Sequence, residues 1–233
     1  LAIAAEVHKS HPDCQFQLFL APTVDLDQLV QYADPVHNPM VTKMGNVGAQ
    51  LICPDQGDPY LLTSTGVTIA ICRQFPALTA LQKLSAALTT VGANTAQLGA
   101  LAVPMIVLLP TQHLEAMRHW DGIPGLLARL PFVGTQFARL INYLIIGGDR
   151  LFAWPNLWAG QEIVPELVGP LTPVGVAEKL AAWLDHPEQL ESVRQQLREI
   201  RGKPGAAHRV ADLCEIAVCD LIAQQLKGLR ISS

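Results

Sequence analysis

The residues best suited to hold an anion lie in one short stretch, VGANTAQLGALAVPMIV, at positions 91–107. Gly92 is followed there by the polar residues Asn94, Thr95 and Gln97. Glycine lets the backbone approach a ligand closely. The first N–H groups of a helix lack partners within it and carry about half a positive charge. We therefore predict that this helix start binds a phosphate or diphosphate. Two or three such donors, at roughly 1.5–3 kcal/mol each, would hold it without a lysine.

Two predicted strands position this stretch. Residues 88–91 are rich in Thr and Val, and residues 105–109 are all apolar, as in a parallel strand covered on both faces. Such strands need a crossover, which is expected to be right-handed. Gly92 would then end the first strand, with Asn94 or Thr95 as the N-cap of a helix over 96–101. Ligands bind at this edge of open α/β sheets. Close packing of the helix against the strands would also require such a turn. Ligand binding and a purely structural role therefore both stay open.

A second polar cluster lies in residues 151–168, LFAWPNLWAGQEIVPELV. Asn156 follows a proline break and is predicted to cap a helix or to recognise polar ligand groups with its amide. Glu162 and Glu166 would share one face of a helix, although the proline between them disfavours a long helix. A carboxylate beside a nucleotide sugar accepts hydrogen bonds from hydroxyls, whereas on an ordinary surface it is simply solvated.

Composition limits the classes of protein to consider. The chain has 233 residues, of which 50% are hydrophobic, which fits one large α/β domain with additions. A net charge of −4 without a basic run disfavours nucleic-acid binding. No zinc-binding, hydrolase or Walker motif occurs. No stretch approaches the ~20 apolar residues of a membrane span. The cysteines lie in apolar surroundings and are predicted to be buried thiols in a reducing compartment: Cys14, Cys53, Cys72, Cys214 and Cys219.

The remaining segments predict alternating helices and strands. Helices are expected over 1–9, 25–33, 76–85, 172–184, 186–201 and 206–226, a buried strand over 15–21, three strand-like pieces in 49–73, and irregular chain over 34–48. The basic residues between 194 and 209 are expected on a solvated helix face. Because the sequence opens inside a predicted helix, we expect a preceding strand and an N-terminal domain outside it.

Residues 111–150 are predicted to form a hydrophobic helical insertion. Between positions 122 and 148 the only charged residues are Arg129 and Arg139, and two apolar helical faces are expected. One interpretation is an amphipathic segment that touches a membrane surface, supported by Trp120, Trp154 and Trp158 nearby. The other is a helical hairpin packed against the sheet or a partner domain.

Together the two polar clusters resemble the lipid-A-disaccharide synthase family, and the resemblance covers most of the chain from Ala86 onward. That family has a Ser-Gly-Thr-Ala-Thr-Leu-Glu turn before a Pro-Met-Val-Val strand, and then a Pro-Asn-Leu-x-Ala motif. The matching residues are Gly92, Thr95, Pro104, Met105, Pro155, Asn156, Leu157, Ala159, Glu162 and Glu166.

The resemblance implies a Rossmann-like parallel sheet flanked by helices, the C-terminal half of a glycosyltransferase-B fold. It implies a hexosyltransferase of lipid A biosynthesis, which transfers a sugar from a UDP-sugar to a lipid-linked acceptor at the cytoplasmic face of the inner membrane. The expected partners are these two substrates, with peripheral membrane contact through 122–148 and a homodimer left open. Neither a cofactor nor a metal ion is expected, because the helix start at Asn94 would stabilise the departing diphosphate.

The resemblance also implies roles for individual residues. Gly92 would allow close approach, Asn94 and Thr95 would contact phosphate, and Gln97 would contact ribose. The sugar or diphosphate would be held by Asn156 with Gln161 or Glu162. Catalytic residues are not assigned, and the general base is expected in the N-terminal domain.

Three departures from the family pattern put this activity in question. Gln97 stands where an acidic residue is expected, Val91 replaces a serine, and Ala93 replaces a threonine. A neutral amide hydrogen-bonds ribose less strongly than a carboxylate, by about 1 kcal/mol. With the long insertion, these departures indicate a divergent branch. The alternative is a non-catalytic protein that keeps the fold and binds a lipid or a protein partner.

Overall fold

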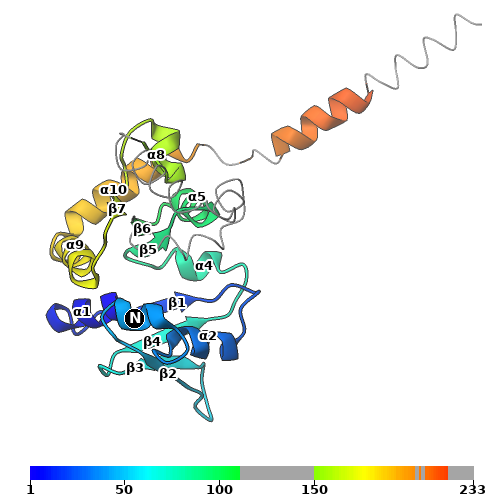
Figure 1. Cartoon of the computed structure of the whole chain (residues 1–233). Helices are drawn as coiled ribbons and strands as arrows, with labels where there is room; N and C mark the ends of the chain where they lie inside the picture. The colour runs from blue at the N-terminus through cyan, green and yellow to red at the C-terminus, as the bar shows by residue number, and fades with distance from the viewer. Residues whose placement is uncertain (111–149, 203–204, 206–207, 220–233) are drawn as a thin grey trace, which may run out of the picture. The chain divides into compact units, whose positions relative to one another are not determined.

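The computed structural model describes residues 1–110, 150–202, 205 and 208–219. The chain divides into a unit of residues 1–200 and a unit of residues 201–233, in which 208–219 is helical. The helices of the first unit are α1 (Ala2–Ser10), α2 (Leu26–Ala33), α3 (Pro39–Lys43), α4 (Leu78–Leu81), α5 (Ala93–Ala100), α8 (Trp154–Ala159), α9 (Pro173–Asp185) and α10 (Pro187–Ile200) (Figure 1). Its strands are β1 (Phe16–Phe19), β2 (Ala49–Ile52), β3 (Tyr60–Thr63), β4 (Thr68–Cys72), β5 (Ala87–Thr90), β6 (Met105–Pro110) and β7 (Glu166–Gly169).

The first sheet, sheet A, has the strand order β1-β4-β3-β2. β1 pairs in parallel with β4, while β2, β3 and β4 form an antiparallel meander, which confirms the three predicted strand pieces. Helices α1 and α2 cover one face, where Ala4 and Leu29 pack against Leu61 and Ile69. Thr68 and Ala70 alternate with buried residues of β4 and are exposed.

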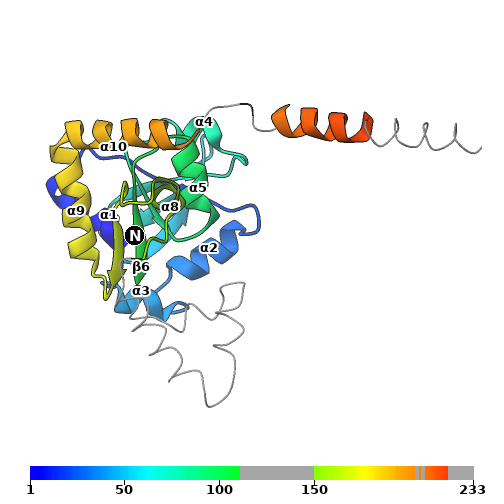
Figure 2. The ribbon, with the colours of Figure 1, turned by 90° about the horizontal axis from the view of Figure 1, so that it is seen from above.

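The second sheet, sheet B, consists of the parallel strands β5-β6-β7. Its central strand is the apolar run, and Met105, Ile106 and Val107 are at most 1% exposed, as predicted for a strand covered on both faces. On one face Met105 packs with Leu98 of α5, and on the other Ile106 packs with Trp183 of α9. Figure 2 shows β6 between these two helices. The protein is therefore a mixed α/β protein with helix-flanked parallel strands, which is compatible with a Rossmann-like fold.

Two helix starts form as their sequences predict. The Asp25 carboxylate accepts a hydrogen bond from the N–H of Gln28 at 2.7 Å, and the Gln28 side chain accepts one from the N–H of Asp25, which is a complete capping box for α2. Thr172 caps α9 through its hydroxyl, and a proline occupies the first turn.

Several local predictions are wrong. Residues 34–48 contain α3, because the Asn38 side chain caps a helix that starts at a proline. The helix predicted over 76–85 is confined to the four residues of α4. The strand β1 contains no buried residue. None of the five cysteines is buried either: Cys14 and Cys72 are half-buried, and the other three are exposed. All five are free thiols, and partial burial raises the pKa of Cys14.

The predicted insertion over 111–150 lies, except for its last residue, outside the described residues. The choice between membrane contact and internal packing for that segment stays a prediction. Among the helices that the structure describes, none combines the length and the apolar character needed to cross a bilayer.

Candidate functional site

The site begins at the bend between β5 and α5. Only Val91 and Gly92 separate the two elements. Gly92 has φ +145°, a conformation that favours glycine, and is exposed at the carboxyl end of β5. A Cβ atom built on Gly92 would meet no other atom of the described residues within 4 Å. Among these residues, the bend therefore faces open space.

Gly92, rather than Asn94 or Thr95, is the N-cap of α5. The predicted cap is wrong by two or three residues, because the N–H and the hydroxyl of Thr95 both donate back to the Gly92 carbonyl, at 3.1 and 2.8 Å, and close the first turn. No side chain caps this helix. In the part of the chain that the structure describes, the backbone N–H groups of Ala93 and Asn94 have no hydrogen-bond partner. Two donors at the positive end of α5 are therefore available to an anion.

Thr95 itself is fully buried. Besides donating to Gly92, its hydroxyl accepts a hydrogen bond from the backbone N–H of Trp154 at 3.1 Å. The side chain thus joins the first turn of α5 to the first turn of α8. This hydroxyl is not available for the phosphate contact that the resemblance implies.

Asn156 is also fully buried, and it lies inside α8 rather than at a break. Its amide nitrogen donates to the Val164 carbonyl at 2.8 Å and to a Glu166 carboxylate oxygen at 2.6 Å. Its amide oxygen accepts from the N–H groups of Ile163 and Val164 at 2.7 and 2.9 Å. Both donors and both lone pairs of the amide are occupied. Asn156 therefore fixes the loop between α8 and β7 and has no group left for a ligand.

Glu166 has a structural role that the sequence did not show. Its carboxylate accepts hydrogen bonds from the N–H groups of Phe152 and Ala153, at 2.8–3.0 Å, in addition to the one from Asn156. A negative charge at the amino end of α8 stabilises that helix. No local signal reveals these contacts, because the carboxylate and the N–H groups lie 13 and 14 residues apart in the chain.

Gln161 and Glu162 lie in the loop between α8 and β7 and are exposed. Helix α8 packs against α5: the N–H of Trp154 contacts Thr95, and Pro155 and Trp158 lie against Gly99. This packing does not by itself bring Gln161 and Glu162 to the bend.

The predicted site residues therefore differ in their exposure. Gly92 and Asn94 are exposed at the bend, and Gln97 is half-buried one turn along α5. The buried Thr95 and Asn156 hold the scaffold, and Gln161 and Glu162 are exposed in the loop between α8 and β7. Among the described residues, no three His, Cys, Asp or Glu side chains gather as metal ligands would.

No protein-family model, curated protein or solved structure matches the chain. The resemblance to lipid-A-disaccharide synthases accordingly stays a prediction.

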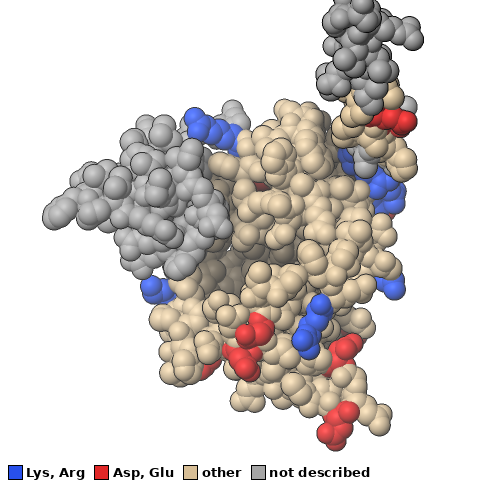
Figure 3. Space-filling view, turned by 90° about the vertical axis from the view of Figure 1, so that its right-hand side faces the viewer, with Lys and Arg blue, Asp and Glu red and all other residues tan. Residues whose placement is uncertain are grey.

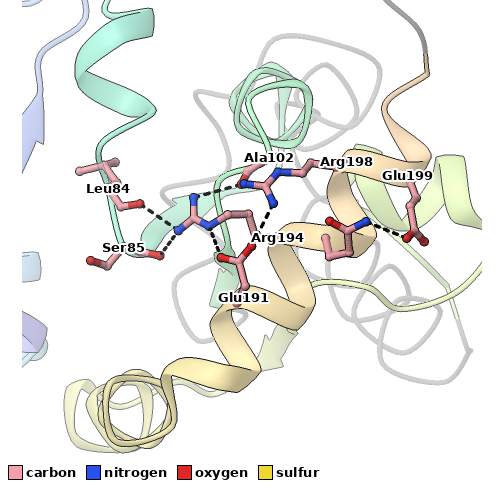
Figure 4. A network of polar contacts seen from close by, with 8 residues as sticks. Leu84, Ser85, Ala102, Glu191, Arg194, Arg198 and Glu199 are labelled. Carbon is pink, nitrogen blue, oxygen red and sulfur yellow. Dashed lines mark hydrogen bonds and ion pairs between the residues drawn. The ribbon is translucent and has the colours of Figure 1, made fainter.

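Arg194 of α10 connects this helix to the chain segments just before β5 and just after α5 (Figure 4). The Arg194 guanidinium donates to the carbonyls of Leu84, Ser85 and Ala102, each at 3.4 Å, and its Nε pairs with Glu191 at 3.2 Å. These carbonyls lie just before β5 and just after α5. Arg194 was expected on a solvated face, but its side chain is only 19% exposed. Helix α10 is thereby tied to both ends of the β5–α5 unit.

Proposed function

We propose that the chain supplies the nucleotide-binding half of a glycosyltransferase that transfers a sugar from a UDP-sugar to a lipid-linked acceptor. The observation that carries this proposal is the bend at Gly92, which is open among the described residues, followed by the N–H groups of Ala93 and Asn94, which have no partner among those residues. Helix starts at the carboxyl ends of parallel strands are common binding positions for phosphates. The diphosphate of the donor is the part of the substrate that this geometry suits.

The same N–H groups would act during sugar transfer. As the bond between sugar and diphosphate breaks, negative charge grows on the departing diphosphate oxygen. Fixed donors aimed at that oxygen stabilise the transition state more than the bound substrate. The exposed Asn94 side chain offers a further amide, and Gln97 is near enough along α5 to reach ribose hydroxyls. Asn156 would not contribute contacts with the sugar, because its amide is engaged within the chain.

Calorimetry with UDP and with uridine tests this proposal on the 233-residue chain. If the bend holds the diphosphate, UDP binds and uridine binds at least roughly tenfold more weakly, because each hydrogen bond to a charged group contributes about 1.5–3 kcal/mol. Absence of heat at millimolar UDP, or equal affinity for the two ligands, would contradict the proposal.

A second candidate function is a non-catalytic protein that binds a lipid or a protein partner through the same fold. Two observations favour it. The polar groups of Thr95, Asn156 and Glu166 are all engaged within the chain. Helix α8 also exposes apolar side chains next to one another: Trp154, Leu157 and Trp158 are 46%, 48% and 43% exposed.

Vesicle flotation separates this candidate from the first. A lipid-binding protein would float with anionic phospholipid vesicles, and the double variant Trp154→Ala, Trp158→Ala would lose flotation. Flotation without UDP binding would support the non-catalytic function, and UDP binding without flotation would support the transferase.

A further inference from the structure

Strand β2 forms an open edge of sheet A. Among the described residues, β2 pairs only with β3. Figure 1 shows it as the outer strand of this sheet, on the side away from sheet B. Its four residues include neither a charged residue nor a proline, which commonly keep a strand edge from pairing with another chain. This edge is therefore suited to accept a further strand.

The ladder between β2 and β3 shows which peptide groups of β2 face outward. The Ser64 N–H donates to the Gly48 carbonyl at 2.8 Å, so Gly48 belongs to a hydrogen-bonded pair of this ladder. In antiparallel strands such residues alternate with residues that bond on the other side. Gly48 and every second residue after it thus bond to β3, whereas Ala49, Leu51 and Cys53 direct their N–H and carbonyl groups outward. These three N–H groups have no partner among the described residues.

Apolar surface flanks this edge. Leu51 is partly buried against the core of sheet A. At the start of β2, a Cβ atom built on Gly48 would lie 2.8 Å from the Cδ atom of Pro35. The next residue, Val36, is 83% exposed, and Tyr32 of α2, the helix that packs against β2, is 58% exposed. Exposed apolar surface beside an open strand is typical of a contact with another protein chain.

The charges around β2 favour a second copy of the same strand as that partner. Asp55 and Asp58 lie in the turn that follows β2, Lys43 ends the helix α3 that precedes it, and all three are exposed. Within the part of the chain that the structure describes, none of the three forms an ion pair. Because an antiparallel partner runs in the opposite direction, the acidic turn of one copy would lie beside Lys43 of the other.

The wider surface of this half of the unit does not oppose such pairing. Figure 3 shows red and blue groups set apart from one another on the lower half of the unit, where sheet A lies, within a largely uncharged surface. A surface with charges of both signs has no strong field of one sign that would keep two copies apart.

We propose that β2 pairs in antiparallel orientation with β2 of a second copy, about a two-fold axis at Leu51. The pairing joins the two four-stranded sheets into one. With the axis at this residue, Leu51 pairs with its own counterpart and Ala49 pairs with Cys53, so that all the outward peptide groups named above find partners. The two Leu51 side chains lie opposite each other on the face that α1 and α2 cover, where they shield each other from water. Each copy offers the same surface, as a two-fold interface requires.

Hydrogen exchange of the 233-residue chain at two protein concentrations tests the pairing. A short edge contact is expected to form between about 10 µM and about 1 mM. The amides of Ala49, Leu51 and Cys53 should exchange roughly fivefold or more slowly at the higher concentration. The amides of Gln50 and Ile52 already bond to β3 and should change less, which makes them the internal control. No slowing at the outward amides, or equal slowing of both sets, would overturn the proposal.

Charge reversal tests the orientation. In sedimentation equilibrium, Lys43→Glu should raise the Kd of the dimer roughly tenfold, because like charges then lie side by side. The double variant Asp55→Lys, Asp58→Lys should have the same effect, and the triple variant that combines all three changes should regain the Kd of the parent chain. These side chains are exposed, so the fold should tolerate the changes.

Asp13→Lys is the matched control, because Asp13 is an exposed acid that lies just before β1, at the opposite edge of sheet A. It should leave the Kd of the dimer unchanged. A triple variant that stays as weak as the single reversal would overturn the antiparallel pairing. A dimer that none of the reversals weakens would place the second copy elsewhere on the molecule and would also overturn the proposal.

Discussion

The amide of Asn156 holds the loop between α8 and β7, and its removal tests that role. Asn156→Ala would leave the N–H groups of Ile163 and Val164 and the carbonyl of Val164 without their partner in a buried place. At about 1–3 kcal/mol for each buried unpaired group, we expect the free energy of unfolding to fall by about 3 kcal/mol or more. Denaturant unfolding measures this loss.

Asn94→Ala is the matched control, since Asn94 is exposed. Its free energy of unfolding should change by less than about 0.5 kcal/mol, while UDP affinity falls. An unchanged unfolding midpoint for Asn156→Ala would contradict the structural role.

The separation of hydrogen-bond partners along the chain decided which residue roles could be predicted from the sequence. Asp25 and Thr172 were identified as caps because their partners lie three residues away. Asn156 and Glu166 have partners 7 to 14 residues away, on the far side of a loop. Residue type and spacing could not tell whether their polar groups face a ligand or the chain.

At the scale of elements, Arg194 is expected to contribute more stability than its neighbour Arg198. Both pair with Glu191, but Arg194 also donates to three backbone carbonyls. Arg194→Met should lower the free energy of unfolding by about 1–3 kcal/mol, because those carbonyls lose their donor. Arg198→Met removes one largely exposed ion pair and should cost at most about 1 kcal/mol. Equal losses for the two variants in denaturant unfolding would contradict this account.

The sequence largely predicted which segments are helices and which are strands. It did not predict that the strands form two separate sheets. Residues 105–109 are apolar throughout and became the buried centre of sheet B, and the pieces in 49–73 became β2, β3 and β4. The separation of β1 from β5 depends on long-range pairing, which a local pattern does not contain. Helix α3 was missed because the prolines and glycines of residues 34–48 outweighed the capping signal of Asn38.

At the scale of the whole molecule, an α/β fold places a glycine bend and a helix start at the carboxyl end of a parallel strand. The sequence predicted this arrangement at Gly92, and the structure adds the unpaired N–H groups of Ala93 and Asn94. The side chains of Thr95 and Asn156 are buried and engaged within the chain. Binding through the backbone is therefore the central claim.

UDP calorimetry on Ala93→Pro and Ala93→Ser tests this claim most directly. Ala93 is the first residue of α5, where proline fits the helix and removes only the N–H, whereas serine keeps it. We expect Ala93→Pro to bind UDP roughly tenfold or more weakly, with no loss of Tm, because one hydrogen bond to the diphosphate is gone. Ala93→Ser should bind as the parent chain does. Equal UDP affinity for the two variants would contradict the claim that the backbone at this bend holds the nucleotide.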